Sequence, residues 1–130
     1  MRKVSYFGLF LLTMTLLGCK KTMLVQDYPG QQIPHYAQEK STVESVEKAI
    51  MRAAISLGWK TEVIEKGKIL ATLNIRKHQL VVDITHDDKS YSIKYKDSVN
   101  LKYDGKKIHR QYGNWVKNLI NSINAFSVSD

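Results

Sequence analysis

The chain has 130 residues, 43% of them hydrophobic and 25% charged, which leaves room for one domain folded around its own core. The single cysteine excludes an internal disulfide, so the core alone must stabilise the domain. A net charge of +8 favours contact with anionic surfaces such as phospholipid, lipopolysaccharide, nucleic acid or acidic proteins, without selecting one of them.

The first eighteen residues have the order of a secretory signal peptide. Arg2 and Lys3 form a basic n-region, and the apolar residues 4–17 have about the length of an h-region. A transmembrane helix is the alternative, but it needs roughly 20 apolar residues, whereas this run ends at Gly18, before a cysteine and two lysines. We expect export and removal of residues 1–18, which lowers the net charge from +8 to +6.

The end of this segment, Leu16-Leu17-Gly18-Cys19, resembles the lipobox of bacterial lipoproteins. The resemblance implies cleavage before Cys19, diacylglycerol on its thiol, and an acyl chain such as palmitate on the new amino group, with no other cofactor. Each buried methylene contributes about 0.8 kcal/mol, so two or three chains would anchor the protein permanently in the cell envelope. A buried free cysteine in an apolar segment is the alternative reading.

The residues after the cysteine bear on the address of the protein. In Gram-negative lipoproteins an aspartate at this place resembles an inner-membrane retention signal, and Lys20 is not an aspartate. The resemblance therefore implies the outer membrane, facing the periplasm. Lys20 and Lys21 would add about 1 kcal/mol each against anionic headgroups.

Residues 19–40 are rich in glutamine, proline, glycine and other polar residues, with a chain-breaking pair at Pro29-Gly30. After the cysteine that the lipobox resemblance implies is lipidated, the composition predicts a flexible tether that spans roughly 25 Å on average. Docking of Tyr28, Ile33 and Tyr36 on the domain or on a partner is the alternative.

A first helix is predicted from about Thr42 to Leu57. Ser41 and Glu44 have the spacing of a capping box, and apolar residues then recur at intervals of three and four. Gly58 is well placed to end this helix in a left-handed conformation.

Downstream the apolar period changes to two, which predicts four strands. The apolar positions are Trp59, Thr61 and Val63, then Ile69, Ala71, Leu73 and Ile75, then Leu80, Val82 and Ile84, then Tyr91, Ile93 and Tyr95. Turns at 65–67, 77–78 and 87–88 would pair Val63 with Ile69, Ile75 with Leu80, and Ile84 with Tyr91. These registers place every apolar set on one face of an antiparallel sheet and leave the other face polar.

A second apolar stripe at helical spacing runs from Ile108 to Ile123 and predicts a C-terminal helix. The expected fold class is α+β, a four-stranded antiparallel meander with both helices on one face, in the order α-β-β-β-β-α. The expected domain comprises residues 41–126, followed by a tail at 127–130. Small envelope lipoproteins that assist membrane assembly have a similar arrangement of a sheet with helices on one side.

No catalytic residue and no metal site are predicted. Of the four histidines, His35 lies in the tether, His109 near the last helix, and His78 and His86 at opposite ends of one strand, roughly 26 Å apart. We therefore expect that they do not converge on a metal ion. A weak cation site at His86-Asp87-Asp88 is less expected than a solvated turn.

No serine, threonine, lysine or tyrosine stands in a Gly-x-Ser-x-Gly or Ser-x-x-Lys motif, and no glycine-rich phosphate loop is present. Asp83, Ser92 and Lys94 form the nearest approach to a catalytic cluster. Mixed charges are normal on an exposed sheet face, however. We expect a protein that is not an enzyme.

One stretch mixes basic and aromatic residues and is the candidate binding surface. Its cations are Lys94, Lys96, Lys102, Lys106, Lys107 and Arg110, interleaved with tyrosines. The alternative is that Tyr91, Tyr95 and Tyr112 point into the core and the lysines form an ordinary solvated face. Nucleic acid would suit a similar surface, but an exported, membrane-held protein rarely meets it.

The leading functional hypothesis is a membrane-anchored, non-enzymatic accessory or assembly factor that binds another envelope protein. Binding of an anionic envelope lipid or glycan through the basic surface is the second hypothesis. Inhibition of a host enzyme such as lysozyme ranks lower, because a basic domain suits a basic enzyme poorly, and a hydrolase would require a concave site with convergent polar groups.

Overall fold

The computed structural model describes residues 21–128. This part of the chain contains a five-stranded antiparallel sheet, a two-stranded sheet and three helices. The expected signal peptide, the lipidation site Cys19 and the last two residues lie outside the described residues.

The elements follow one another along the chain as two short strands, two helices, four long strands, a short strand and a final helix. Their bounds are β1 (Thr22–Leu24), β2 (Tyr28–Gln32), α2 (His35–Gln38), α3 (Val43–Ser56), β3 (Trp59–Glu65), β4 (Lys68–Ile75), β5 (His78–His86), β6 (Ser90–Val99), β7 (Lys107–His109) and α4 (Gln111–Ser127).

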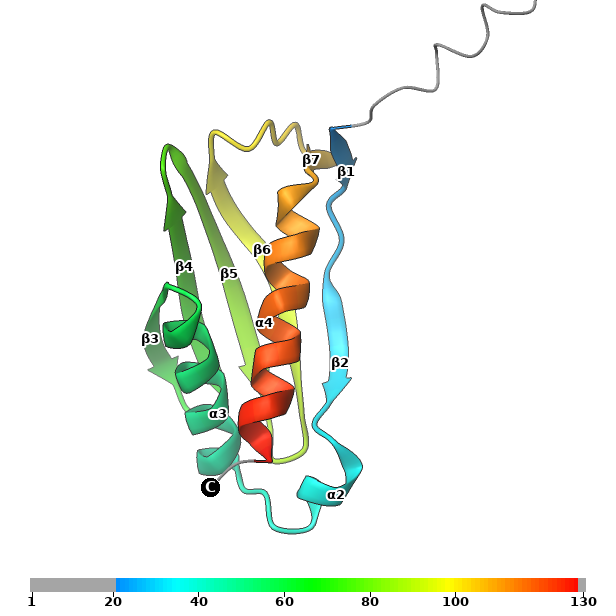
Figure 1. Ribbon diagram of the computed structural model, residues 1–130, viewed down its shortest axis with the longest axis vertical. Coiled ribbons are helices and arrows are strands. Elements are labelled where there is room, and N and C mark those ends of the chain that lie inside the picture. Colours follow the sequence, from blue (N-terminus) through cyan, green and yellow to red (C-terminus); the bar gives the residue numbers. More distant parts are fainter. Residues whose placement is uncertain (1–20, 129–130) are drawn as a thin grey trace, which may run out of the picture.

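The predicted fold, a four-stranded meander in the order α-β-β-β-β-α, is wrong. The large sheet has the order β2-β6-β5-β4-β3, so the four expected strands are neighbours but β2 adds a fifth strand beside β6. A second, two-stranded sheet pairs β1 with β7. Both additional N-terminal strands come from the segment that we interpreted as a flexible tether, and Figure 1 shows this segment running along the side of the domain.

The sequence of β2 lacks the pattern typical of a strand because it contains Pro29 and Gly30. An edge strand tolerates a proline, whose missing N–H costs no ladder bond on the open side. A bulge interrupts the pairing with β6 between Tyr28 and Gln31, and Gly30 has a φ of +58° there. Ile33 follows the strand and is buried at 1% exposure, which is the docking that we had considered as the alternative to a tether.

The predicted strand registers place the side chains on the correct face of the sheet, but some of the predicted cross-strand partners are wrong. Val63 pairs with Ile69 as expected. At the next two hairpins the partners are shifted by two residues, so that Leu73 lies opposite Leu80 and Ile84 opposite Ile93. A shift of two keeps every side chain on its face, because side chains alternate with period two.

The helix α3 begins one residue later than the capping-box prediction requires. Thr42 is the N-cap, and its side chain accepts the backbone N–H of Ser45 while the Ser45 hydroxyl accepts the N–H of Thr42. Ser41 instead donates to the backbone carbonyl oxygen of Gln38. At the other end Gly58 has a φ of +91°, the left-handed conformation predicted for it.

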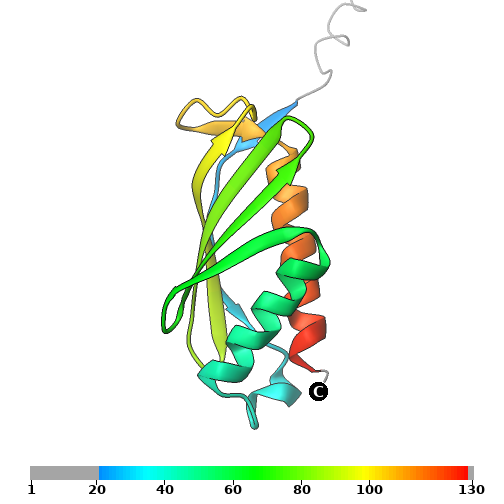
Figure 2. The same ribbon diagram turned by 90° about the vertical axis from the view of Figure 1, so that its left-hand side faces the viewer.

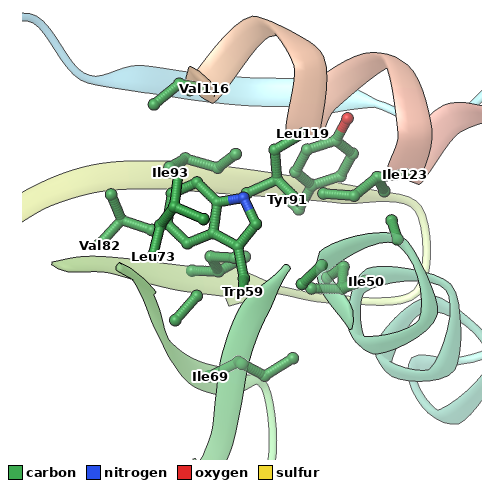
Figure 3. Close-up of a cluster of buried hydrophobic side chains, with 14 of the residues drawn as sticks. Ile50, Trp59, Ile69, Leu73, Val82, Tyr91, Ile93, Val116, Leu119 and Ile123 are labelled. Carbon is green, nitrogen blue, oxygen red and sulfur yellow. The ribbon is translucent and has the colours of Figure 1, made fainter. Parts of the chain in front are cut away.

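Both long helices lie on the same face of the sheet (Figure 2). Figure 3 shows the indole ring of Trp59 among the side chains of Leu73, Ile93 and Leu119, which come from β4, β6 and α4. Tyr91 joins this core, and its hydroxyl donates to Asn124 Oδ1 at 2.9 Å. Burial raises the pKa of Tyr91 far above its ordinary value, so the hydroxyl stays protonated.

Candidate functional site

The N-terminal segment is joined to the start of α4 by backbone hydrogen bonds. The carbonyl oxygen of Lys21 accepts the N–H of Arg110 at 3.0 Å, and the N–H of Val25 donates to the carbonyl oxygen of Lys106 at 2.9 Å. Between these two bonds Thr22 pairs with His109 in the β1–β7 ladder. The position of residue 21 on the domain is therefore fixed.

Cations gather at this same end of the molecule. The loop between β6 and β7, the β4–β5 turn, β1 and the start of α4 meet there, at the top of Figure 1. We call this region the basic end and define it by its exposed cationic residues, which are Lys21, Arg76, Lys77, Lys102, Lys106, Lys107 and Arg110.

The predicted binding surface is divided between two places. Its members in the β6–β7 region and beside α4, namely Lys102, Lys106, Lys107 and Arg110, belong to the basic end. Lys94 and Lys96 instead lie within β6, on the sheet face turned away from the helices. Both are exposed, and Lys96 Nζ lies 3.7 Å from Asp83 Oδ2.

One carboxylate stabilises the loop that carries Lys106 and Lys107. Asp104 Oδ1 accepts the backbone N–H of Lys107 at 2.7 Å and that of Lys106 at 2.9 Å. These two bonds lower the pKa of Asp104 below its ordinary value. The carboxylate thereby holds the backbone of its own turn, which directs the two lysine side chains outward.

Exposed apolar side chains accompany the cations. Leu24 in β1 is 65% exposed, Val99 at the end of β6 is 53% exposed, and Tyr103 in the following loop is 43% exposed. The Tyr103 ring packs on the ring of Tyr95 with centroids 4.5 Å apart. Of the tyrosines expected in the core, Tyr112 is fully buried, Tyr91 likewise, and Tyr95 partly.

Two of the four histidines, contrary to the sequence reasoning, lie together. The rings of His78 and His109 are 6.4 Å apart between centroids, and the His78 ring lies 6.4 Å from the ring of Trp115. They border a cavity of about 260 Å³ that Arg76 and Gln111 also line. The sequence could not reveal this pair, because only the strand topology brings the start of β5 to the start of α4.

The hydrogen bonds of the two imidazoles define which ring nitrogens face a ligand. His78 Nδ1 lies 2.8 Å from the carbonyl oxygen of Asn100 and therefore donates to it. His109 Nδ1 accepts the backbone N–H of Gln111 at 3.1 Å. The Nε2 atoms of both rings remain for a ligand, and that of His109 carries the hydrogen in the neutral ring.

Burial lowers the pKa of His109, and the positive charges of Lys102, His78, Arg110 and Lys21 lower it further. A positive charge on the His109 ring is thus disfavoured by its surroundings. The same field attracts an anion into the cavity.

Residues of the two other clusters considered in the sequence take part in hydrogen bonds and strand pairing of the sheet. Ser92 Oγ accepts the backbone N–H of Gly30 at 3.0 Å, which helps to hold β2 on β6. Lys94 lies opposite Asp83 in the β5–β6 ladder, as the mixed-charge interpretation expected. Asp87 Oδ1 accepts the N–H groups of Lys89 and Ser90 and closes the β5–β6 turn.

The opposite end of the domain has cavities of its own. One of about 480 Å³ borders α2 and is lined by His35, Tyr36, Gln38, Glu39 and Lys89. Tyr36 is 77% exposed, so this aromatic ring projects from the domain instead of docking on it.

In comparisons with known proteins, no family model, no curated protein and no solved structure matches this chain. The helices of residues 21–128 include none with the length and apolar character that a membrane span requires. In the same range no three histidine, cysteine or acidic side chains are placed to share a metal ion.

Proposed function

We propose that this chain is a lipid-anchored accessory protein of the bacterial envelope whose basic end lies on the anionic headgroups of the membrane. The observation that carries the proposal is the hydrogen bond from Arg110 to Lys21, because it fixes residue 21 beside the cations. Cys19 is two residues earlier, so an acyl chain on its thiol would start at most about 7 Å along the backbone from the basic end. The basic end would then face the bilayer without a tether between them.

The chemistry of the basic end suits this position. Each lysine or arginine near an anionic surface contributes about 1 kcal/mol. Leu24, Val99 and Tyr103 add exposed apolar area among these charges, the combination found in proteins that lie at a membrane interface. Because of this position, we place contact with an anionic lipid before binding of another envelope protein, which was the leading hypothesis from the sequence.

The lipid anchor is tested by the intact mass of the chain purified from bacteria. We expect a mass that corresponds to residues 19–130 with diacylglycerol and an acyl chain, and an unprocessed chain for Cys19→Ser. A full-length, unmodified wild-type chain in the cytosol would refute the anchor.

The membrane contact is tested separately, without the lipid. Residues 20–130 contain every described element and every core residue. This soluble chain, checked for cooperative unfolding, should sediment with vesicles of equal parts phosphatidylcholine and phosphatidylglycerol. It should not sediment with pure phosphatidylcholine, and its binding should weaken steeply as salt is added.

Two double charge reversals distinguish binding through the basic end from attraction by the net positive charge of the whole domain. Lys102→Glu with Lys107→Glu should weaken vesicle binding at least about tenfold. Lys40→Glu with Lys48→Glu makes the same change of charge around the start of α3, at the other end of the domain, and should weaken it much less. Equal losses in the two pairs would contradict an oriented contact.

A protein partner remains the second candidate, and the exposure of Tyr36 favours it. With the basic end on the membrane, the α2 end would project into the periplasm (Figure 1). A photo-crosslinking residue in place of Tyr36 should then capture one envelope protein in living cells, whereas one in place of Lys107 should capture lipid. Lipid capture from both positions would refute the second candidate.

A further inference from the structure

We propose that the cavity between the β4–β5 turn and the start of α4 binds the phosphate group of an anionic lipid, held by Arg76, His78 and His109. The lipid source rests on the proposed function, whereas the preference for phosphate rests on the cavity alone. We call this cavity the phosphate pocket.

Most polar groups that line the phosphate pocket donate hydrogen bonds. Arg76 supplies a guanidinium with five N–H donors, and His109 presents Nε2–H because its Nδ1 accepts from the backbone. The Gln111 side chain accepts from Asn114 Nδ2 through Oε1 at 2.7 Å, which leaves its amide N–H groups for a ligand. His78 donates through Nδ1 to the Asn100 carbonyl oxygen, so its Nε2 can accept the hydroxyl of a monoprotonated phosphate.

No carboxylate is found among the described residues that line the pocket, and this favours an anion over a cation. Two imidazoles alone would suit a divalent transition metal. The surrounding charges of Arg76, Lys102, Arg110 and Lys21 oppose a metal ion and favour a ligand with negative charge.

The size and walls of the pocket select a small group. Its volume of about 260 Å³ lies below the roughly 300–1,000 Å³ of sites for drug-sized ligands, so it suits one headgroup phosphate better than a whole lipid. Ile75 and Trp115 form an apolar wall that excludes water from one side and strengthens charge-assisted hydrogen bonds. Arginine matches the geometry of phosphate by donating two parallel hydrogen bonds.

The backbone fixes the arginine at the rim. Ile75 and His78 are paired, so Arg76 and Lys77 form a two-residue turn, in which Arg76 has a φ of +56°. His78 Nδ1 is bonded to the Asn100 carbonyl oxygen, which ties this turn to the loop after β6. The backbone of Arg76 and the ring of His78 are thus held in place before a ligand arrives.

The first arm of the test uses inorganic phosphate and residues 20–130. Imidazole signals are followed by NMR during titration with phosphate, and with sodium chloride at equal ionic strength. Phosphate should shift the signals of His78 and His109 to saturation and raise the pKa of His109, and chloride should do neither. No saturable shift would overturn the proposal.

Substitutions that keep the local hydrogen bonds identify the donors. His109→Asn retains an acceptor for the Gln111 N–H, and Arg76→Gln removes the guanidinium with its charge and most of its donors while keeping a polar side chain. Each should weaken phosphate binding about tenfold or more, because a charge-assisted hydrogen bond contributes at least that factor. Lys77→Gln removes the same charge from the neighbouring position, outside the pocket, and should change the affinity less than about twofold. Equal losses for Arg76→Gln and Lys77→Gln would overturn the pocket.

The second arm distinguishes lipid phosphate from soluble phosphate. Vesicles that contain phosphatidic acid expose a phosphate monoester, and vesicles with phosphatidylserine at matched surface charge do not. The chain should prefer phosphatidic acid, and Arg76→Gln should abolish the preference. Binding of inorganic phosphate without this preference would overturn the lipid source. Equal binding to both vesicles with no phosphate titration would overturn the pocket and leave the proposed function standing.

Discussion

The backbone N–H of Ile33 donates to the carbonyl oxygen of Lys89 at 3.1 Å. This bond ties the chain just after β2 to the turn between β5 and β6. The side chain of Ile33 is 1% exposed and belongs to the core. The segment before α3 is therefore part of the folded domain.

Truncation of that side chain measures how strongly the segment is held. Ile33→Ala should lower the free energy of unfolding by about 2–4 kcal/mol, because it removes buried methyl groups and leaves a cavity. Tyr36→Ala, at 77% exposure three residues later, should change it by less than about 0.5 kcal/mol. Urea denaturation of both variants checks this, and equal stabilities would mean that the segment is a tether after all.

Gly67 should be intolerant of a side chain for two reasons. Its φ is +80°, and an added Cβ would lie 2.9 Å from the backbone carbonyl oxygen of His86. Gly105 has a φ of +98° but no atom within 4 Å of such a Cβ. Gly105→Ala should therefore cost about 1 kcal/mol of unfolding free energy from backbone strain alone. Gly67→Ala should cost clearly more, and thermal melts that rank them in the reverse order would contradict this contact.

Asp87 should contribute stability that disappears in acid. Its hydrogen bonds from the backbone N–H groups of Lys89 and Ser90 lower its pKa below the ordinary 3.8. The contribution is thus complete above that value and is lost as the pH falls through the lower pKa of the folded state. Asp87→Ala should cost about 1 kcal/mol at neutral pH and progressively less below about pH 4. Asp88→Ala, which removes only an exposed ion pair with Lys89, is the control.

His109 should make the domain less stable on mild acidification. Its pKa in the folded state is lowered from the ordinary 6.5 by burial and by Lys102, His78, Arg110 and Lys21. The unfolded chain therefore takes up a proton first, and stability falls as the pH drops below about 6.5. Urea unfolding between about pH 7 and pH 5 should show a smaller loss for His109→Asn than for the wild type. An identical loss would contradict the lowered pKa.

Sequence periodicity predicted the elements whose side chains bury one face. The helix α3 ends as expected before Gly58, and β4, β5 and β6 bury residues of their predicted apolar faces, whereas β3 buries only Trp59 and leaves Val63 41% exposed. Periodicity failed for the strands that are too short or too irregular to show an alternating apolar pattern. β1 and β7 have three residues each, and β2 carries Pro29 and Gly30, so none of the three strands has a pattern to detect.

The candidate site was predicted in part for the same reason. Lys102 to Arg110 are close in sequence, so composition identified them, and the fold keeps them together. Arg76 and His78 come from a distant turn, and only the pairing of β4 with β5 and the contact with Asn100 bring them to His109. Residues that meet through long-range topology leave no signal in local spacing.

The direction of α4 has a mechanical consequence. The helix starts beside the strand that would hold the lipidated terminus, and its seventeen residues rise about 25 Å to the far end of the molecule. With Cys19 acylated, the length of the rigid helix α4 would set the distance between the α2 end and the bilayer. A partner would have to bind the α2 end at that distance from the bilayer. A longer peptide between Cys19 and β1 would allow the domain to rotate freely relative to the membrane.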